Sequence, residues 1–282
     1  MVTEEKRIEE VSFSAAQSGD LDLFLLLEDD SLHVSVTDEA NRVLALTKLV
    51  CQEHTSSHDF LQESMHAEPL LRLKYNSVSV GIGNQTFSLV PKRLFDEQAA
   101  PSVYHHLLGP HGDGFHLVDE FQTDEFVSVF FVEKHLHESI TSLFPGAGIH
   151  HVSSTLIPVF QNLARQNQET ALYGCVSGEV LYLSFFKAGE LQFFNRFHFR
   201  SARDFLYFVL LVYRQFSLKP DQTPLYLGGS LLSDSSIYNL LYRYVRHIRF
   251  LEPPEGVTLQ SLLSKEPRHL YFGSLSLKAC GS

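Results

Sequence analysis

Histidine is the residue type in this sequence whose abundance and clustering could support chemistry. The chain has 15 histidines, and imidazole both binds transition metals and titrates near neutral pH. His54 and His58 have the i, i+4 spacing of helical metal ligands but lack the glutamate of an HExxH motif, and no pair has zinc-finger spacing. We therefore predict surface and core histidines and no metal site. The other clusters are His105, His106, His111 and His116, then His135 and His137, then His150 and His151.

The motifs of common catalytic sites are absent from the sequence. No GxxxxGK(S/T) loop occurs, and the glycine pairs at residues 81–83 and 112–114 lack the third glycine of a dinucleotide-binding loop. Gly228 and Gly229 precede Ser230, but this run is not a GxSxG nucleophile elbow. The sequence therefore names no catalytic residue, although a Ser/His/Asp set can be assembled from distant positions.

Two groups of arginines accompany helices in the second half of the chain. Arg196, Arg200 and Arg203 flank the predicted start of one helix, where the positive end of the helix dipole favours an anion. We predict that this group binds an anion or a partner. A second group lies at the end of another helix, where cations complement the dipole without any ligand, and consists of Arg243, Arg246 and Arg249.

The charge balance argues against nucleic-acid binding. The 282 residues include 22 Lys and Arg and 33 Asp and Glu, a net charge of -11, whereas phosphate contacts require a surplus of cations. Residues 1–140 hold 9 basic and 24 acidic residues (9 - 24 = -15), and residues 141–282 hold 13 and 9 (13 - 9 = +4). The first half is therefore strongly acidic, and acidic solvated faces mainly keep a protein soluble.

The composition predicts a folded, cytoplasmic protein. Hydrophobic residues make up 44% of the chain and charged residues 20%, which is typical of a globular protein. Cys51, Cys175 and Cys280 form no CxxC pair, as expected of reduced thiols. The longest apolar stretch, residues 205–213, has nine residues, whereas a membrane-spanning helix needs about 20.

Hydrophobic patterning predicts alternating strands and helices in the first half. Residues 32–36 and 43–50 form a hairpin, because turn-forming residues separate two β-prone runs. Residues 78–82 and 86–90 form a second hairpin across Gly83 and Asn84, which tolerate positive φ. Further predicted strands are 70–75, 115–121, 125–132 and 149–153. The predicted helices are 57–66, a turn through Leu94 and Phe95, 133–143 and 155–166. Pro158 is tolerated in the last of these because it lies in the first turn.

The second half begins with three predicted strands, at 171–176, 180–186 and 191–199. Glycine-containing turns separate them, which indicates an antiparallel meander. Ser201 and Asp204 form a capping box at the start of a helix that reaches residue 216. The remaining predicted elements are a strand at 224–227, a helix with Ile237, Leu240, Leu241, Tyr244 and Val245 on one face, a strand at 248–251, a short helix at 259–263 and a last strand near Leu270.

Both halves thus open with antiparallel strands and continue with alternating helices and strands. This pattern predicts an α/β protein of two lobes with mixed sheets. The first lobe is expected to comprise residues 1–169, including an acidic N-terminal segment, and the second residues 170–282.

Three segments carry a likeness to known proteins: residues 84–95 (NQTFSLVPKRLF), the early hairpin at 33–49 and residues 173–229. In these segments the sequence resembles an uncharacterised bacterial family, a domain of unknown function. That family is similar in structure to the actin-like ATPases, which include Hsp70, sugar kinases and bacterial cell-division and pilus-assembly actin homologues. The resemblance implies two ribonuclease-H-like lobes, each with a five-stranded mixed sheet, and a cleft between them.

The resemblance also implies where a nucleotide site would lie. In active relatives the opening hairpin of each lobe bears an aspartate and glycines that hold metal-bound phosphates, and the second lobe carries a Gly-Gly pair near adenosine. Here the hairpins at residues 34–39 and 173–179 have no aspartate on the strand. Only Gly228, Gly229 and Ser230 match the adenosine-side pattern, and a plain strand-to-helix turn would need small residues there as well.

We therefore expect a non-catalytic actin-like protein, without a cofactor, that serves as a binding or scaffold module for a protein or small anionic partner. The alternative is a nucleotide-binding phosphotransferase or ATPase that uses ATP and Mg²⁺, with carboxylates shifted to residues such as Asp38, Glu39 and Glu179. Self-association through an exposed strand or apolar patch is a third hypothesis.

Overall fold

The chain folds into two compact units. The computed structural model describes residues 2–10, 13–51, 56–83, 86–96, 105–106, 112–121, 125–259 and 267–280. Unit 1 comprises Met1–Thr155, Gly256–Ser264 and Leu277–Ser282, and unit 2 comprises Leu156–Glu255 and Lys265–Ser276. The boundary expected near residue 170 stays a prediction. Among the described residues, no helix combines the length and apolar character that crossing a bilayer requires.

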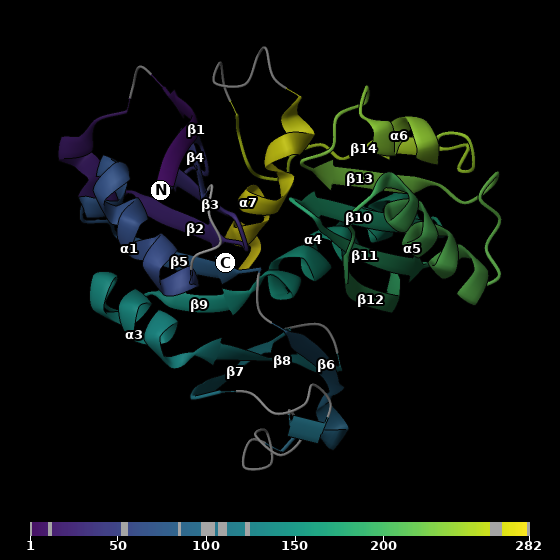
Figure 1. Cartoon of the computed structure of the whole chain (residues 1–282), viewed down its shortest axis with the longest axis horizontal. Coiled ribbons are helices and arrows are strands. Elements are labelled where there is room, and N and C mark those ends of the chain that lie inside the picture. Colours follow the sequence, from purple (N-terminus) through teal and green to yellow (C-terminus); the bar gives the residue numbers. More distant parts are fainter. Residues whose placement is uncertain are drawn as a thin grey trace. The chain divides into compact units, whose positions relative to one another are not determined.

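A six-stranded mixed sheet forms the centre of unit 1 (Figure 1), with the strand order β1-β4-β3-β2-β5-β9. The neighbouring pairs β1–β4, β4–β3 and β3–β2 are antiparallel, whereas β2–β5 and β5–β9 are parallel. Helices α1 (Ser57–Ala67) and α3 (Lys134–Leu143) pack on one face through Phe60, Leu136 and Ile140. The strands are β1 (Val2–Glu9), β2 (Asp22–Leu27), β3 (Ser31–Thr37), β4 (Val43–Cys51), β5 (Ser77–Ile82) and β9 (Gly148–His151).

A separate antiparallel sheet is inserted in unit 1 between β5 and β9. Its order is β6-β8-β7, and it has a small apolar cluster of its own, which includes Val127, Val129 and Phe131. The pairing predicted between residues 115–121 and 125–132 is confirmed. The strands are β6 (Phe87–Pro91), β7 (Gly114–Glu120) and β8 (Phe126–Glu133), with the 3₁₀ turn η3 (Lys92–Leu94) after β6.

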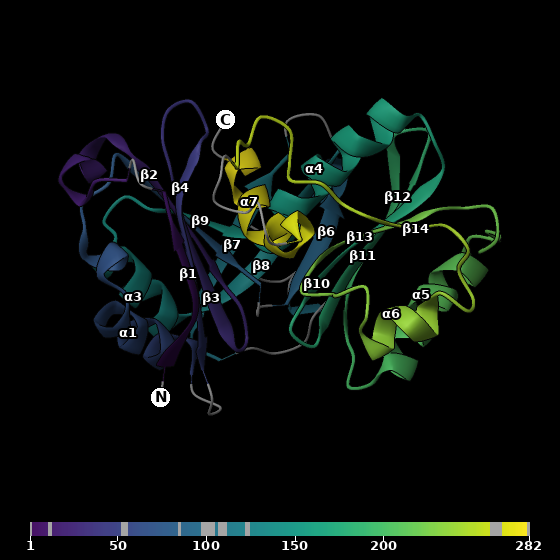
Figure 2. The ribbon, with the colours of Figure 1, turned by 90° about the horizontal axis from the view of Figure 1, so that it is seen from above.

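Unit 2 contains a five-stranded mixed sheet with the order β12-β11-β10-β13-β14. Helices α5 (Ala202–Gln215) and α6 (Ser236–Leu241) lie on one face, and α4 (Val152–Asn167) and α7 (Phe272–Ser276) lie on the other (Figure 2). The predicted meander and the Ser201–Asp204 capping box are confirmed. The strands are β10 (Ala171–Ser177), β11 (Val180–Lys187), β12 (Glu190–His198), β13 (Leu225–Gly229) and β14 (Ile248–Phe250).

The same strand order occurs in both units. The strands β4-β3-β2-β5-β9 and β12-β11-β10-β13-β14 each consist of a three-stranded antiparallel meander followed by two parallel strands. The predicted α/β class and its duplication are thus confirmed. One correction concerns the first sheet, which has a sixth strand because the acidic N-terminal segment adds β1 to its edge.

Two local predictions of strands are wrong because short helical turns form at these places instead. Residues 70–75 form no strand, since the 3₁₀ helix η2 (Pro69–Arg72) begins there and the Glu68 side chain accepts the Leu70 N–H at 2.9 Å. The strand expected near Leu270 is instead η5 (Arg268–Tyr271) followed by α7. All five residues of α7 are buried, and it packs against β10 and β13.

Pairing and length differ from prediction at three other places. β5 pairs with β2 and β9, so both of its edges are occupied and β6 pairs with β8 instead of forming a hairpin with β5. Helix α6 ends at Leu241, and the pattern to Val245 continues as turns. Helix α4 begins at Val152, which places Pro158 in its interior. Predictions on His54, His111, Asn84, Gln85 and residues 260–263 fall outside the described residues.

The added strand β1 is anchored by an ion pair that reaches the core of unit 1. Glu68 has no exposed surface, and its Oε1 accepts a hydrogen bond from Arg7 Nη2 at 2.6 Å. Burial lowers the pKa of the Arg7 guanidinium, but its contacts with Glu68 outweigh this and leave the pKa above the ordinary value. The buried carboxylate therefore depends on a cation supplied by the edge strand.

We predict that Arg7→Ala lowers the free energy of unfolding by about 2–3 kcal/mol, because it leaves a buried carboxylate without its cation. Lys48→Ala is the control, since Lys48 pairs at 2.6 Å with the half-exposed Glu5, and it is expected to cost less than about 1 kcal/mol. Urea unfolding followed by circular dichroism measures both variants. Equal losses would contradict the anchoring role of Arg7.

Candidate functional site

Ligands of open α/β sheets bind at the carboxyl ends of the parallel strands, so each unit has one edge where a site is expected. In unit 1 this edge is formed by the ends of β2, β5 and β9, and it includes the β2–β3 turn. In unit 2 it is formed by the ends of β10, β13 and β14, and it includes the β10–β11 turn. The predicted residues Gly228, Gly229 and Ser230 lie at the second edge.

Gly229 and Ser230 close a tight junction between β13 and β10. Gly229 has a φ of +83°, and a β-carbon at this position would collide with the Val176 carbonyl oxygen. The Ser230 N–H donates to that oxygen at 2.8 Å, and the Ser230 Oγ accepts the Gly178 N–H at 3.2 Å. Local backbone geometry is thus sufficient to require glycine at position 229.

Gly228 is covered by the C-terminal segment of the same unit. A β-carbon on Gly228 would lie 2.9 Å from Cβ and Cγ of Phe272 in α7. The adjoining turn η5 is held by His269, whose Nε2–H donates to the Leu231 carbonyl at 2.8 Å and whose ring stacks on Phe250 with centroids 4.0 Å apart. Burial lowers the pKa of His269, so the imidazole is neutral in this position.

The opening hairpin of unit 1 differs from the prediction. β2 is the first strand of the repeated order, so the turn equivalent to Ser177–Glu179 of unit 2 connects β2 to β3 and contains Glu28, Asp29 and Asp30. Glu28 is buried and accepts a hydrogen bond from Ser31 Oγ at 3.2 Å. Three carboxylates at this turn oppose the approach of a phosphate group.

The shifted carboxylates of the alternative hypothesis are engaged in local structure. Asp38 lies in the β3–β4 turn, at the opposite end of the strands from the β2–β3 turn, and its carboxylate accepts from the Ala40 N–H and from the Arg42 N–H and Nε at 2.6–3.0 Å. Burial raises the pKa of Asp38, but these hydrogen bonds outweigh it and hold the pKa below the usual range. Glu39 is exposed, and Glu179 forms an exposed pair with His198 at 3.5 Å.

A buried polar network joins the inserted sheet of unit 1 to β9. Asp119 of β7 accepts from His150 Nδ1 and from the His151 N–H, both at 2.9 Å. His151 has no exposed surface, and its Nδ1 accepts the Ser153 N–H at 3.1 Å and lies 2.7 Å from Ser153 Oγ. Ser153 Oγ is in turn 3.1 Å from Ser128 Oγ of β8.

The protons of this network can be assigned from its donors. Because Nδ1 of His151 accepts the Ser153 N–H, the ring proton is on Nε2, and the Ser153 hydroxyl donates to Nδ1. Ser128 then donates to Ser153. Neither Ser153 nor His151 has exposed surface, so this serine cannot act as a nucleophile on a substrate, and the network positions the inserted sheet. The His150–His151 pair marked this place in the sequence, whereas Asp119, Ser128 and Ser153 carried no signal.

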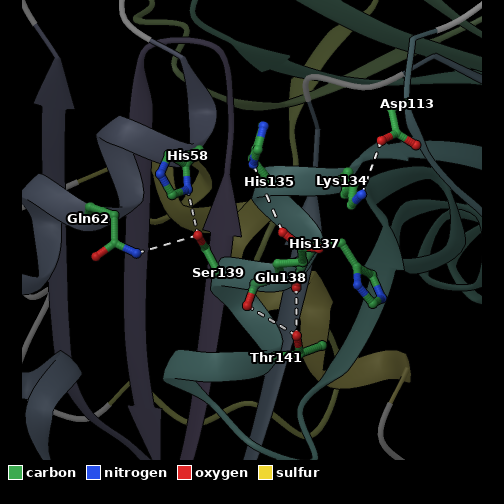
Figure 3. Close-up of polar contacts among 9 residues, drawn as sticks. All are labelled: His58, Gln62, Asp113, Lys134, His135, His137, Glu138, Ser139 and Thr141. Atoms are coloured by element: carbon green, nitrogen blue, oxygen red, sulfur yellow. Dashed lines mark hydrogen bonds and ion pairs between the residues drawn. The ribbon is translucent and has the colours of Figure 1, made fainter.

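Further histidines of unit 1 lie between helices α1 and α3 (Figure 3). His58 Nδ1 of α1 lies 2.5 Å from Ser139 Oγ of α3, and Gln62 Nε2 donates to the same oxygen at 3.4 Å. The rings of His58 and His135 have centroids 6.1 Å apart. In the part of the chain that the structure describes, no three His, Cys, Asp or Glu side chains are grouped so that they could hold a metal ion.

The predicted arginine group is divided between two elements. Arg196 lies on β12, and the exposed Arg200 and Arg203 lie at the start of α5. Ser201 Oγ accepts the Asp204 N–H at 3.2 Å, and Asp204 Oδ2 accepts the Arg200 N–H at 3.1 Å. The bond from Arg200 is the main cause of a pKa of Asp204 below the usual value. A carboxylate of the chain itself therefore already lies at the positive end of α5.

Comparison with known proteins identifies a family and a fold. The profile of a family described as a protein of unknown function, DUF3822, matches residues 10–248. No curated protein matches the sequence.

Two solved structures are similar over most of their length. A protein of Bacteroides thetaiotaomicron with an actin-like ATPase fold and unknown function has a TM-score of 0.77 and 20% identity, over 85% of this chain and 93% of that one. A chain of the PilM–PilN type IV pilus biogenesis complex has a TM-score of 0.59 and 16% identity, over 92% and 98%. The protein therefore has the actin-like ATPase fold that the resemblance implied.

We predict that burial of neutral His269 makes the stability of the protein depend on pH. The unfolded state binds a proton near pH 6.5 and the folded state at lower pH, so the free energy of unfolding decreases as pH falls through this window. His269→Gln keeps an N–H donor for Leu231 but removes this contribution. Urea unfolding at pH 7.5, 6.5 and 5.5 measures both proteins, and an equal loss on acidification would contradict a neutral buried His269.

Proposed function

The chain belongs to the DUF3822 family of proteins of unknown function, and from the covered edge of unit 2 we propose that it is a non-catalytic actin-like protein of the cytoplasm. In this proposal it acts as a binding or scaffold module for a partner protein and requires no nucleotide. The observation that carries the proposal is the contact between Gly228 and Phe272.

The Gly-Gly pair is the one element of the nucleotide site that the sequence retains. The resemblance to active relatives implies a position for this pair near adenosine. Here Phe272 packs on Gly228, and His269 fixes the preceding turn to Leu231 and Phe250. The glycines are explained by packing within the chain, so their presence does not require a nucleotide.

Unit 1 supports the same proposal through charge. Its β2–β3 turn carries Glu28, Asp29 and Asp30 in place of an aspartate with glycines. Phosphate groups are repelled by carboxylates at short range, and buried Glu28 is hydrogen-bonded to Ser31. Asp38 and Glu179 were predicted to take the place of the missing carboxylates of the nucleotide site. Asp38 is paired with Arg42, and Glu179 is paired with His198.

The proposal of a protein partner also draws on likeness of fold. The similar chain in the PilM–PilN complex is part of an assembly of two proteins. An actin-like fold can therefore occur in protein assembly, and the same class of role is proposed here. Cys51, Cys175 and Cys280 form no CxxC pair, in keeping with a cytoplasmic location.

Calorimetric titration with Mg-ATP and Mg-ADP tests the proposal. We expect no saturable heat up to about 5 mM nucleotide and no release of phosphate, because the edge of unit 2 is covered. Saturable binding that Ser230→Glu abolishes would overturn the proposal, since Ser230 is exposed and directly follows the two glycines. Gln192→Glu is the control, because it adds the same charge on the outer strand β12.

A further inference from the structure

The outer face of α5 carries an exposed stripe of arginine and apolar residues. Arg203, Tyr207, Leu211 and Arg214 follow one another at intervals of four, four and three residues, so they lie on one side of the helix. All four are exposed, Tyr207 by 60% and Leu211 by 36%. We refer to these four residues as the α5 stripe.

A second exposed aromatic group follows the neighbouring helix α6. Tyr242 is 63% exposed and Tyr244 is 54% exposed. α5 and α6 pack against each other, and their buried sides contribute Val209, Val212 and Leu241 to the core of unit 2. Helix α6 ends at Leu241, so the tyrosines lie on the turns that follow it, and the outer layer of unit 2 presents them in addition to the α5 stripe.

This composition is unusual for a surface that only meets water. Seven large hydrophobic side chains are exposed among the described residues, and four of them are Tyr207, Leu211, Tyr242 and Tyr244. Solvated helix faces normally carry Lys and Glu, whereas tyrosine and arginine are the residues enriched at binding hot spots. The concentration of these residues on one layer therefore indicates a binding surface.

The two guanidinium groups of the stripe form no ion pair with any residue that the structure describes. No ion pair among the described residues uses the guanidinium groups of Arg203 or Arg214. The one acidic residue of α5, Asp204, accepts the Arg200 N–H. A partner with carboxylates would supply the missing charges at both ends of the stripe.

We infer that the α5 stripe binds an acidic segment of a partner protein. Arg203 and Arg214 are separated by about 16 Å along the helix axis, so they would pair with carboxylates at the two ends of the segment while its apolar centre contacts Tyr207 and Leu211. The net charge of -11 repels polyanions such as nucleic acids and anionic membranes at longer range. A short acidic segment along α5 would instead lie against the second half of the chain, where residues 141–282 hold 13 basic and 9 acidic residues.

This inference rests on the proposed function, because it names the surface and the partner chemistry of the binding module. In this inference Arg203 binds the partner through its guanidinium group, and the capped N-terminus of α5 takes no part. Arg196 on β12 and Arg200, whose backbone N–H is bound to Asp204, are not needed for it.

Selection from a displayed library of random 12-residue peptides on the full-length protein tests the inference. We expect the enriched peptides to carry Asp or Glu on both sides of an apolar centre. Arg203→Glu combined with Arg214→Glu should weaken their binding at least tenfold, and raising the salt concentration from 50 to 300 mM should weaken binding to the unmodified protein. Circular dichroism and thermal unfolding verify that the variant is folded.

The matched control combines Arg72→Glu with Lys187→Glu, which changes the net charge equally at exposed positions outside α5, and it should alter affinity less than twofold. The inference is overturned if no peptide is enriched, if the enriched peptides are not acidic, or if both double variants lose binding equally. Stripe-dependent binding of single-stranded DNA or of phosphatidylserine vesicles in place of peptides would also overturn it. None of these results bears on nucleotide binding, so the proposed function is tested separately by the titration with Mg-ATP.

Discussion

The structure of unit 2 depends on covering both faces of a mixed sheet whose central strands are almost entirely buried. Every residue of β13, and six of the seven in β10, is buried, so apolar segments must lie on each side. Helices α5 and α6 cover one face. The other receives α4 and the C-terminal α7, where Phe160, Tyr173 and Phe272 stack at 5.6–5.7 Å. The same packing places Phe272 against Gly228, so the C-terminal segment completes the core beside the glycine pair.

In unit 1 the sheet must also be covered, and polar contacts take a larger part in holding the covering segments. Residues at the C-terminus again cover the sheet, since Leu277 lies against Gly81 of β5 and Lys278 Nζ donates to Thr37 Oγ1 at 3.0 Å. Its two additions, the edge strand β1 and the inserted sheet, are each held by a buried carboxylate, Glu68 for the strand and Asp119 for the sheet. Because hydrogen bonds to charged groups have strict geometry and are costly to leave unmade, these carboxylates fix the position of the additions.

Sequence patterning predicted the elements whose signals are local. The β10–β12 meander was predicted because its turns contain Gly178 and Gly189, both with positive φ in the structure, and α5 because Ser201 caps it. β2 was missed because Asp22 and the acidic turn after Leu27 obscured a central strand, and the opening hairpin was therefore assigned one strand too late. The pairing of β6 with β8 and the contact of Phe272 with Gly228 depend on residues far apart in the chain. Accordingly, the fold class could be predicted, and these long-range contacts could not.

A glycine pair at the end of a strand indicates a ligand only if the space beside it is open. At position 229 the backbone conformation alone excludes a side chain, because a β-carbon would meet the Val176 carbonyl. At position 228 the excluded volume belongs to Phe272, a residue 44 positions further along the chain. Both glycines are needed whether or not the protein binds a nucleotide, because Gly229 closes the junction between the strands and Gly228 leaves room for α7. Internal packing alone therefore accounts for the glycine pair, and the exposed arginines and tyrosines on α5 and after α6 are a more informative place to look for function.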